Sequence, residues 1–337
     1  MIRVAVLINR TRTPAGRVPV LAGLSLAKRA VLAAQRAGIE EVLVLGGADP
    51  ASWLAEDARV RLRWRWIPPA RLAGSSVAGL ERESEVVSLR VLHRKLHEPF
   101  LLLFADSVVE AAALRALREV SLNELLLLRV EPQAPVNAEW AAASIFVVAP
   151  ELLVRLESVG SEIETLEQLW AFPAWRHLTG TLRPQGRTWE RTTDRRRLAA
   201  IERELSQLHL KPTDGIYAKF NKTVIAQPLI RFFLRTPATP NLVTGLGLVF
   251  GLLAGGVFVL GGYWWAILGA ILAYLSAIMD HVDGMVARLK FQESAFGVWF
   301  ESAVDYTSYL AIFTGMAIGL YRETHFVHYL FVGGLFI

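Results

Sequence analysis

Hydrophobic and polar positions are distributed differently in the first and last parts of the chain. Up to about Lys222, short apolar runs alternate with stretches dense in charge, whereas after Asn241 charges are sparse and apolar runs are long. Short apolar runs bounded by turn residues are typical of buried strands, and uncharged runs of about 20 residues are long enough to cross a bilayer. The pattern predicts a soluble domain followed by a membrane domain.

The soluble part alternates predicted strands with predicted helices. A helix is expected from Leu24 to Ala37, where Gly38 ends it. Alternating strands and helices are typical of an α/β sandwich with a mostly parallel sheet. The strands are expected at residues 2–8, 41–45, 61–67, 99–104, 125–130 and 144–148.

A breaker sequence, KPTDG at residues 211–215, separates this part from the membrane part. Residues 216–235 follow, with apolar positions at helical spacing and lysines and arginines among them. This pattern predicts an amphipathic helix that lies in the membrane interface. We therefore divide the chain into a soluble domain (1–210), a linker with an interfacial helix (211–240) and a transmembrane domain (241–337).

The transmembrane part predicts three spans and the beginning of a fourth. Gly261 and Gly262 predict a tight turn, so that the second span returns antiparallel to the first. The last apolar run is too short to cross a bilayer, so we expect the transmembrane domain to be incomplete in this chain. The spans are expected at residues 242–262, 263–279 and 295–321, and the last run covers residues 326–337.

Composition constrains the partners and the orientation. The chain of 337 residues has 53% hydrophobic residues, a formal net charge of +5 and no cysteine, which excludes disulfides and thiolate metal sites. Basic residues precede the first span and recur at Arg288 and Lys290 on the same side, with Arg322 as a modest exception, so the soluble domain is expected in the cytoplasm. Membrane lipids are the expected partners of these basic residues, and no groove of basic and aromatic residues indicates nucleic acid.

Four acidic residues stand inside the segments that are predicted to cross the membrane. Asp280 and Asp283 share one helix face, and Glu301 and Asp305 share a face of the next helix. A charge in hydrocarbon costs at least ~2.5 kcal/mol, so these acids need a neutralising partner. A divalent metal with oxygen ligands is the natural one, and together with Arg288 it would suit a diphosphate. The short hairpin lets the two faces meet, which predicts phosphoryl transfer here.

These residues form the pattern D-x2-D-G-x2-A-R-x8-G-x3-E-x3-D, which closely resembles the signature of the CDP-alcohol phosphotransferases, also called CDP-alcohol phosphatidyltransferases. The resemblance implies an all-α polytopic membrane enzyme. Such an enzyme uses Mg²⁺ or Mn²⁺ to transfer a phospho-alcohol group from a CDP-alcohol to an acceptor alcohol, releasing CMP. It implies synthesis of phospholipids or inositol phosphodiesters, and it allows a homodimer.

The resemblance also implies roles for individual residues. Asp280, Asp283 and Glu301 would be metal ligands, and Asp305 would be the catalytic base and a further metal ligand. The third acid of the signature is normally aspartate, whereas Glu301 keeps the charge and reaches one methylene further. Asn241, in TPNLVT, matches the family's entry to its first span. The implied CDP-binding residues are Asp280, Asp283, Gly284, Ala287, Arg288, Gly297 and Asn241.

The soluble part resembles the nucleotidyltransferase fold of the sugar-phosphate cytidylyltransferases, through AGRVPVLAGLSLAKRAVLAAQRAGIEEVLVLGG, FLLLFADSVV and SIFVVAPELL. The resemblance places Asp106 at the position of a metal ligand. However, the Gly-rich loop that holds the triphosphate is reduced to Gly16, and Arg191 stands near Trp189, where a second metal aspartate is expected. We therefore interpret this domain as catalytically degenerate, with a structural or regulatory role. The alternative is that Arg10, Arg12 and Arg17 hold phosphates.

The expected architecture is thus an α/β nucleotidyltransferase-like sandwich fused to an all-α polytopic transmembrane domain. The fused domain and the KPTDG linker are similar to those of bifunctional members that join an inositol-phosphate cytidylyltransferase to a di-myo-inositol phosphate phosphate synthase. This similarity makes inositol phosphate an expected acceptor, and a degenerate domain would require another protein to supply the CDP-alcohol. The alternative function is a membrane-anchored nucleotide-binding or scaffold protein without transferase activity.

Overall fold

The computed structural model divides into two compact units, Met1–Ile201 and Glu202–Ile337. The division falls within helix α7 (Arg195–Gln207), before the domain boundary that the sequence predicts at residue 211. Residue 211 itself lies outside the described residues. The structure describes residues 1–9, 18–46, 49–68, 89, 92–93, 95–132, 145–156, 165–189, 191–207, 215 and 219–335.

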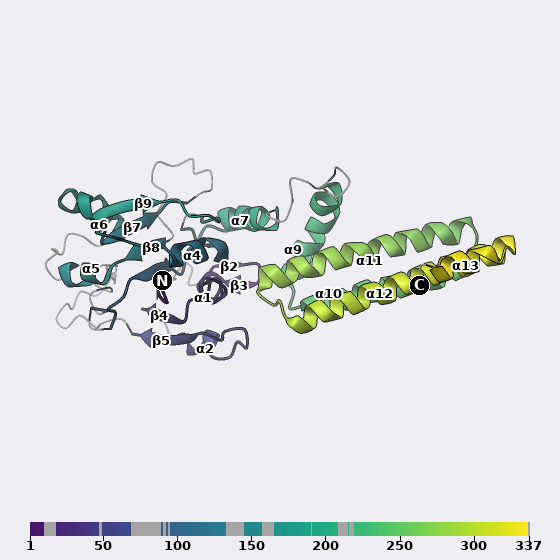
Figure 1. Ribbon diagram of the computed structural model, residues 1–337, viewed down its shortest axis with the longest axis horizontal. Helices are drawn as coiled ribbons and strands as arrows, with labels where there is room; N and C mark the ends of the chain where they lie inside the picture. Colours follow the sequence, from purple (N-terminus) through teal and green to yellow (C-terminus); the bar gives the residue numbers. More distant parts are fainter. Residues whose placement is uncertain are drawn as a thin grey trace. The chain divides into compact units, whose positions relative to one another are not determined.

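A seven-stranded sheet forms the centre of the N-terminal unit, in the order β5-β4-β1-β6-β8-β7-β9 (Figure 1). Neighbouring strands pair in parallel except for the two pairs that include β8, so the expected mostly parallel sheet is confirmed. The strands are β1 (Val4–Ile8), β4 (Glu41–Leu45), β5 (Arg63–Ile67), β6 (Phe100–Phe104), β7 (Leu127–Val130), β8 (Ile145–Val148) and β9 (Thr179–Leu182).

The core of this unit lies around β1, β6 and β8, whose sequences are almost continuously apolar. Such runs suit strands that are covered on both faces, and Phe100, Phe104 and Phe146 are fully buried there. The ring of Phe104 meets that of Phe146 edge to face, with centroids 6.2 Å apart. The remaining helices of the unit are α1 (Leu26–Arg36), α2 (Ala51–Leu54), α4 (Ala111–Arg118), α5 (Pro150–Arg155), α6 (Leu166–Ala171) and the 3₁₀ helix η2 (Pro173–Leu178).

Two local expectations for this unit were wrong. The helix expected from Leu24 begins at Leu26, because residues 24–25 form β3 (Leu24–Ser25), which pairs with β2 (Val20–Leu21). The Ser25 hydroxyl accepts a hydrogen bond from the Lys28 amide at 3.3 Å, which caps the shortened helix. Strand β9 was not expected, because TGTL has only one large apolar residue, and it forms by parallel pairing with β7.

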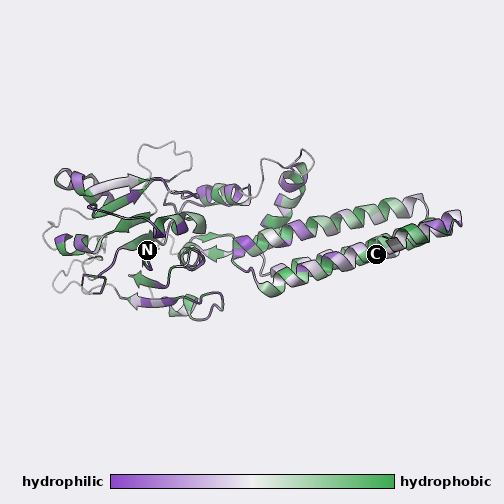
Figure 2. Ribbon diagram, viewed as in Figure 1, coloured by the Kyte–Doolittle hydropathy of each residue, from purple (hydrophilic) through white to green (hydrophobic). Residues whose placement is uncertain are grey.

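The C-terminal unit is helical. A π-helix, η3 (Asn221–Ala226), leads into α9 (Gln227–Arg235), which packs against α11. Three helices in the described part of the chain are long and apolar enough to cross a membrane: α10 (Pro240–Val259), α11 (Tyr263–Lys290) and α12 (Ala295–Thr324). Figure 2, coloured by hydropathy, shows that most of their residues are hydrophobic, and α13 (His328–Leu335) follows them. The three expected spans are thus confirmed as helices of sufficient length.

Glycines let α10 pack closely against its neighbours. A Cβ on Gly255 would lie 2.4 Å from the Ala311 carbonyl oxygen, and one on Gly315 would lie 2.1 Å from the Gly255 carbonyl oxygen, so α10 and α12 nearly touch through their backbones. Gly261 and Gly262 have φ angles of 71° and 88°, which glycine adopts without strain, and they form the predicted tight turn between α10 and α11.

Candidate functional site

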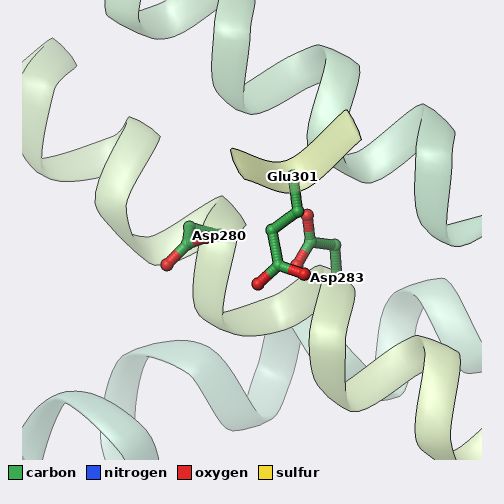
Figure 3. Close-up of side chains that lie close together, drawn as sticks. All are labelled: Asp280, Asp283 and Glu301. Carbon is green, nitrogen blue, oxygen red and sulfur yellow. The ribbon is translucent and has the colours of Figure 1, made fainter. Parts of the chain in front are cut away.

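The acidic residues of α11 and α12 come together at one end of the helices. Asp280, Asp283 and Glu301 each offer one carboxylate oxygen, and these three oxygens lie within 4.8 Å of one another. Figure 3 shows the side chains of Asp283 and Glu301 beside each other, with Asp280 to one side of them. The helical spacing predicts that the acids of α11 and the acids of α12 lie close together. In the structure, three of the four acids form one group.

Local capping residues bring the two stripes into position. Helix α11 ends at Phe291, whose φ of 55° is left-handed, and its amide donates to the Arg288 carbonyl oxygen. Helix α12 begins three residues later, where the Ser294 hydroxyl accepts from the Gly297 amide at 3.0 Å. Because this connection is so short, Glu301 lies opposite the last turns of α11.

Asp283 is the most buried member of the group, with only 3% of its surface exposed. Its Oδ2 accepts a hydrogen bond from the Thr244 hydroxyl of α10. Its Oδ1 is buried and has no hydrogen-bond partner among the described residues. A buried carboxylate oxygen without a donor is costly, and a hard divalent cation would satisfy it with the oxygens of Asp280 and Glu301. The residues present therefore fit a divalent metal.

Asp305 lies one helical turn beyond Glu301 on α12 and is half-buried. Its carboxyl group is within hydrogen-bonding reach of that of Asp280. It is not one of the three residues whose oxygens form the compact group. Asp305 therefore lies next to the candidate metal position, beside Asp280. Because its carboxylate is not part of the compact group, it is available for a role other than metal binding.

The predicted CDP-binding residues lie at the same end of the three helices as the acids. A Cβ on Gly297 would lie 3.6 Å from the Asn241 side-chain oxygen, so the first turns of α10 and α12 face each other here. The exposed Arg288 folds back over Gly284, and its Nε donates to the Gly284 carbonyl oxygen at 3.0 Å. Ala287 follows Asp283 by one turn and is half-buried.

Two buried polar residues of the helical unit, Lys290 and Thr244, are not identified from the sequence. The Lys290 ammonium group is buried and donates to three carbonyl oxygens, those of Phe233, Thr236 and Ala238, each at 2.8 Å. It thereby ties the end of α9 and the turn into α10 to the end of α11. The signal in the sequence is a lysine at the end of an apolar helix, which by itself indicates only the orientation of the helix.

In the N-terminal unit, Asp106 follows β6 at the carboxyl edge of the sheet. Its Oδ1 accepts from Arg191 Nε at 3.0 Å, and the Arg191 guanidinium carbon lies 3.8 Å from the centre of the Phe104 ring. The carboxylate that resembles a metal ligand is therefore neutralised by a cation of the chain itself. Arg10, Arg12 and Arg17, the alternative phosphate ligands, lie outside the described residues.

Two solved structures similar to the chain are a UDP-glucose pyrophosphorylase complexed with UDP-glucose and an inositol-1-phosphate CTP transferase from T. maritima. The first is 10% identical with a TM-score of 0.47 and covers 62% of this chain and 100% of its own. The second is 14% identical with a TM-score of 0.41 and covers 60% of this chain and 97% of its own.

Two relatives from Aquifex aeolicus (strain VF5) are similar over a part of the chain. A "bifunctional IPC transferase and DIPP synthase" is 30% identical over 93 residues, and an uncharacterized protein is 33% identical over 98 residues. Each match covers 28% of this chain, but they cover only 21% and 46% of the respective relatives. The chain thus matches less than half the length of either relative.

A family comparison covers the helices that carry the acids. Residues 237–336 match the CDP-alcohol phosphatidyltransferase family, and this range contains every residue of the pattern from Asp280 to Asp305. The C-terminal region of the chain, residues 237–336, is therefore a domain of the CDP-alcohol phosphatidyltransferase family.

Proposed function

We propose that this protein transfers the phospho-alcohol group of a CDP-alcohol to an acceptor hydroxyl group and releases CMP. The observation that carries the proposal is the group of Asp280, Asp283 and Glu301 within the region that matches this family. In it, Asp283 Oδ1 has no hydrogen-bond partner among the described residues. Ionised acids held this close together in an apolar helical unit repel one another, and a divalent cation between them would relieve that repulsion.

The substrate would bind at the end of the helices where these acids converge. Mg²⁺ or Mn²⁺ held by Asp280, Asp283 and Glu301 would neutralise the diphosphate. Arg288 is exposed beside Gly284, so its guanidinium group is free to turn towards phosphate oxygens, for which its planar fork is suited. Asn241 and Gly297 would line the cytidine side, and the small Gly284 and Ala287 leave room for the CDP.

Asp305 would act as the base. It takes the proton of the acceptor hydroxyl group, whose oxygen forms a bond to the β-phosphorus of the CDP-alcohol. The bond from this phosphorus to the oxygen shared with the α-phosphate breaks, and CMP leaves with the electron pair. The products are a phosphodiester, CMP and the proton on Asp305. Its place beside Asp280, outside the compact group, supports a role in proton transfer.

The acceptor and the compartment are inferred from weaker observations. A relative whose name includes IPC transferase and DIPP synthase favours inositol phosphate as the acceptor, and phospholipid precursors are the other class. The distribution of basic residues favours an integral membrane protein with its soluble unit and its acids in the cytoplasm, in contact with lipids. The Asp106–Arg191 pair supports a non-catalytic role for the N-terminal unit, so another protein would supply the CDP-alcohol.

The proposal is tested by measuring CMP release from a panel of CDP-alcohols and acceptors, with Mg²⁺ or Mn²⁺. Replacing Asp305 by asparagine keeps the size of the side chain and removes the base, so we expect a loss of at least about 100-fold. Glu323→Gln is the matched control, because it removes an exposed acid from the far end of the same helix. If no CDP-alcohol is consumed with either metal, the transferase proposal fails and a nucleotide-binding or scaffold role replaces it.

A further inference from the structure

Thr244 connects α10 to the acidic group without being an acid itself. It lies one turn into α10, is buried to all but 6% of its surface, and its Oγ1 contacts two acceptors. One is Asp283 Oδ2 and the other is the Pro240 carbonyl oxygen at 3.2 Å. A hydroxyl group can donate only one hydrogen bond, and a bond to an ionised carboxylate is stronger than one to a carbonyl group. The Thr244 hydroxyl group therefore donates to Asp283 Oδ2.

The hydrogen bond leaves the two oxygens of Asp283 in different situations. Oδ2 is occupied by Thr244, whereas Oδ1 is buried without a partner in the described part of the chain. Asp280 and Glu301 accept no hydrogen bond from a hydroxyl or amide group among the described residues, and both are half-buried. Among the described residues, Asp283 is therefore the one acid of the group whose carboxylate is held by a hydroxyl group of a neighbouring helix.

We propose that Thr244 is a positioning residue, which holds the Asp283 side chain so that Oδ1 alone faces the divalent cation. This inference rests on the metal site of the proposed function. Partners that orient a metal ligand typically contribute 10–100-fold in metal affinity or activity. Thr244 also links α10 to the metal position, which Asp280 and Asp283 reach from α11 and Glu301 reaches from α12.

Binding of Mn²⁺ to the purified chain in detergent micelles, followed by electron paramagnetic resonance, tests this role without any substrate. Thr244→Val keeps the shape of the side chain and removes the hydroxyl group, and we expect it to weaken Mn²⁺ binding about 10–100-fold. Thr244→Ser restores the hydroxyl group and should recover most of the affinity. Ser276→Ala is the matched control, because Ser276 Oγ bonds the Gly247 carbonyl oxygen at 2.8 Å across the same pair of helices. It should leave Mn²⁺ affinity unchanged.

A second measurement separates positioning from folding. In a double-mutant cycle, Thr244→Ala should weaken Mn²⁺ binding in the unaltered chain but add nothing in an Asp283→Asn background, because the ligand that it orients is then already altered. Additive losses would show that Thr244 acts on stability alone and would overturn the proposal. So would an unchanged affinity in Thr244→Val, or a Thr244→Ser variant as weak as Thr244→Val.

The outcome is distinguishable from failure of the proposed function. A chain that releases CMP but binds Mn²⁺ equally well with and without the Thr244 hydroxyl group would remove the positioning role and keep the transferase. A chain that shows the Thr244-dependent affinity but consumes no CDP-alcohol would keep the positioning role and remove the transferase. A chain that binds no Mn²⁺ would overturn the positioning role together with the metal site.

Discussion

Glu301 is the residue at which this chain departs from the usual form of its signature. Its longer side chain still brings a carboxylate oxygen within 4.8 Å of oxygens of Asp280 and Asp283, because α12 begins so soon after α11 ends. The extra methylene therefore does not remove the acid from the group. This geometry supports a glutamate ligand in place of an aspartate.

Substitutions at Glu301 test that interpretation. Glu301→Gln keeps the reach but removes the charge, and we expect it to weaken Mn²⁺ binding about 10–100-fold and to lower CMP release in parallel. Glu301→Asp keeps the charge and shortens the reach, so its loss should be smaller. If the glutamine variant binds Mn²⁺ as well as the unaltered chain, Glu301 is not a ligand.

At the scale of elements, a buried lysine joins three segments of the helical unit. All three protons of the Lys290 ammonium group are used by the carbonyl oxygens of Phe233, Thr236 and Ala238. The Phe233 carbonyl belongs to the last turn of α9 and also accepts hydrogen bonds from the Thr236 amide at 3.3 Å and the Thr236 hydroxyl group at 3.0 Å. Lys290 therefore reinforces the capped end of α9 and holds the turn that leads to Asn241.

Removing this cap should destabilise the helical unit. Lys290→Met keeps the aliphatic chain and removes the three hydrogen bonds of the buried ammonium group, so we expect the unfolding free energy to fall by about 3 kcal/mol. Thermal melting in detergent measures this change. The control is Arg322→Met, since Arg322 is exposed and donates to the Val259 carbonyl oxygen at 3.0 Å. Equal effects of the two substitutions would contradict a special role for the buried cation.

Replacing either of two adjacent glycines of α10 by alanine should have opposite effects on stability. A Cβ on Gly255 would lie 2.4 Å from the Ala311 carbonyl oxygen, whereas a Cβ on Gly256 would meet nothing within 4 Å. Gly255→Ala should therefore force α10 and α12 apart and cost about 1–3 kcal/mol. Gly256→Ala should be neutral or slightly stabilising, because alanine favours helix over glycine. Melting of the two variants in detergent tests the helix packing directly, and equal melting temperatures would contradict it.

At the scale of the whole molecule, the charge distribution predicts an orientation in the membrane. The chain has no cysteine, so single cysteines can be introduced and labelled selectively. Glu293 and Glu323 are exposed acids near opposite ends of α12, which makes them a matched pair. We expect a membrane-impermeant maleimide to label a Glu323→Cys variant in intact cells. It should label a Glu293→Cys variant only after the membrane is opened. The reverse pattern would place the acids outside the cytoplasm.

The hydrophobic pattern of the sequence predicts individual strands but not their order and direction in the sheet. The apolar runs of β1, β4 and β6 predict buried strands, since each can be recognised within its own sequence. The reversed direction of β8 and the addition of β9 depend on which strand edge each segment meets. Neither residues 145–148 nor residues 179–182 contain that information locally.

The sequence alone determined the long apolar helices of the C-terminal unit and the acids that stand on them. Helical periodicity places Asp280 and Asp283 on one face, and a short connection returns Glu301 towards that face. Only the tertiary structure decided which neighbours complete the site. Thr244 reaches Asp283 because α10 packs against α11, and Lys290 reaches three carbonyl groups because α9 folds back along the same helix. Local periodicity cannot predict such contacts, because they depend on how separate helices pack together.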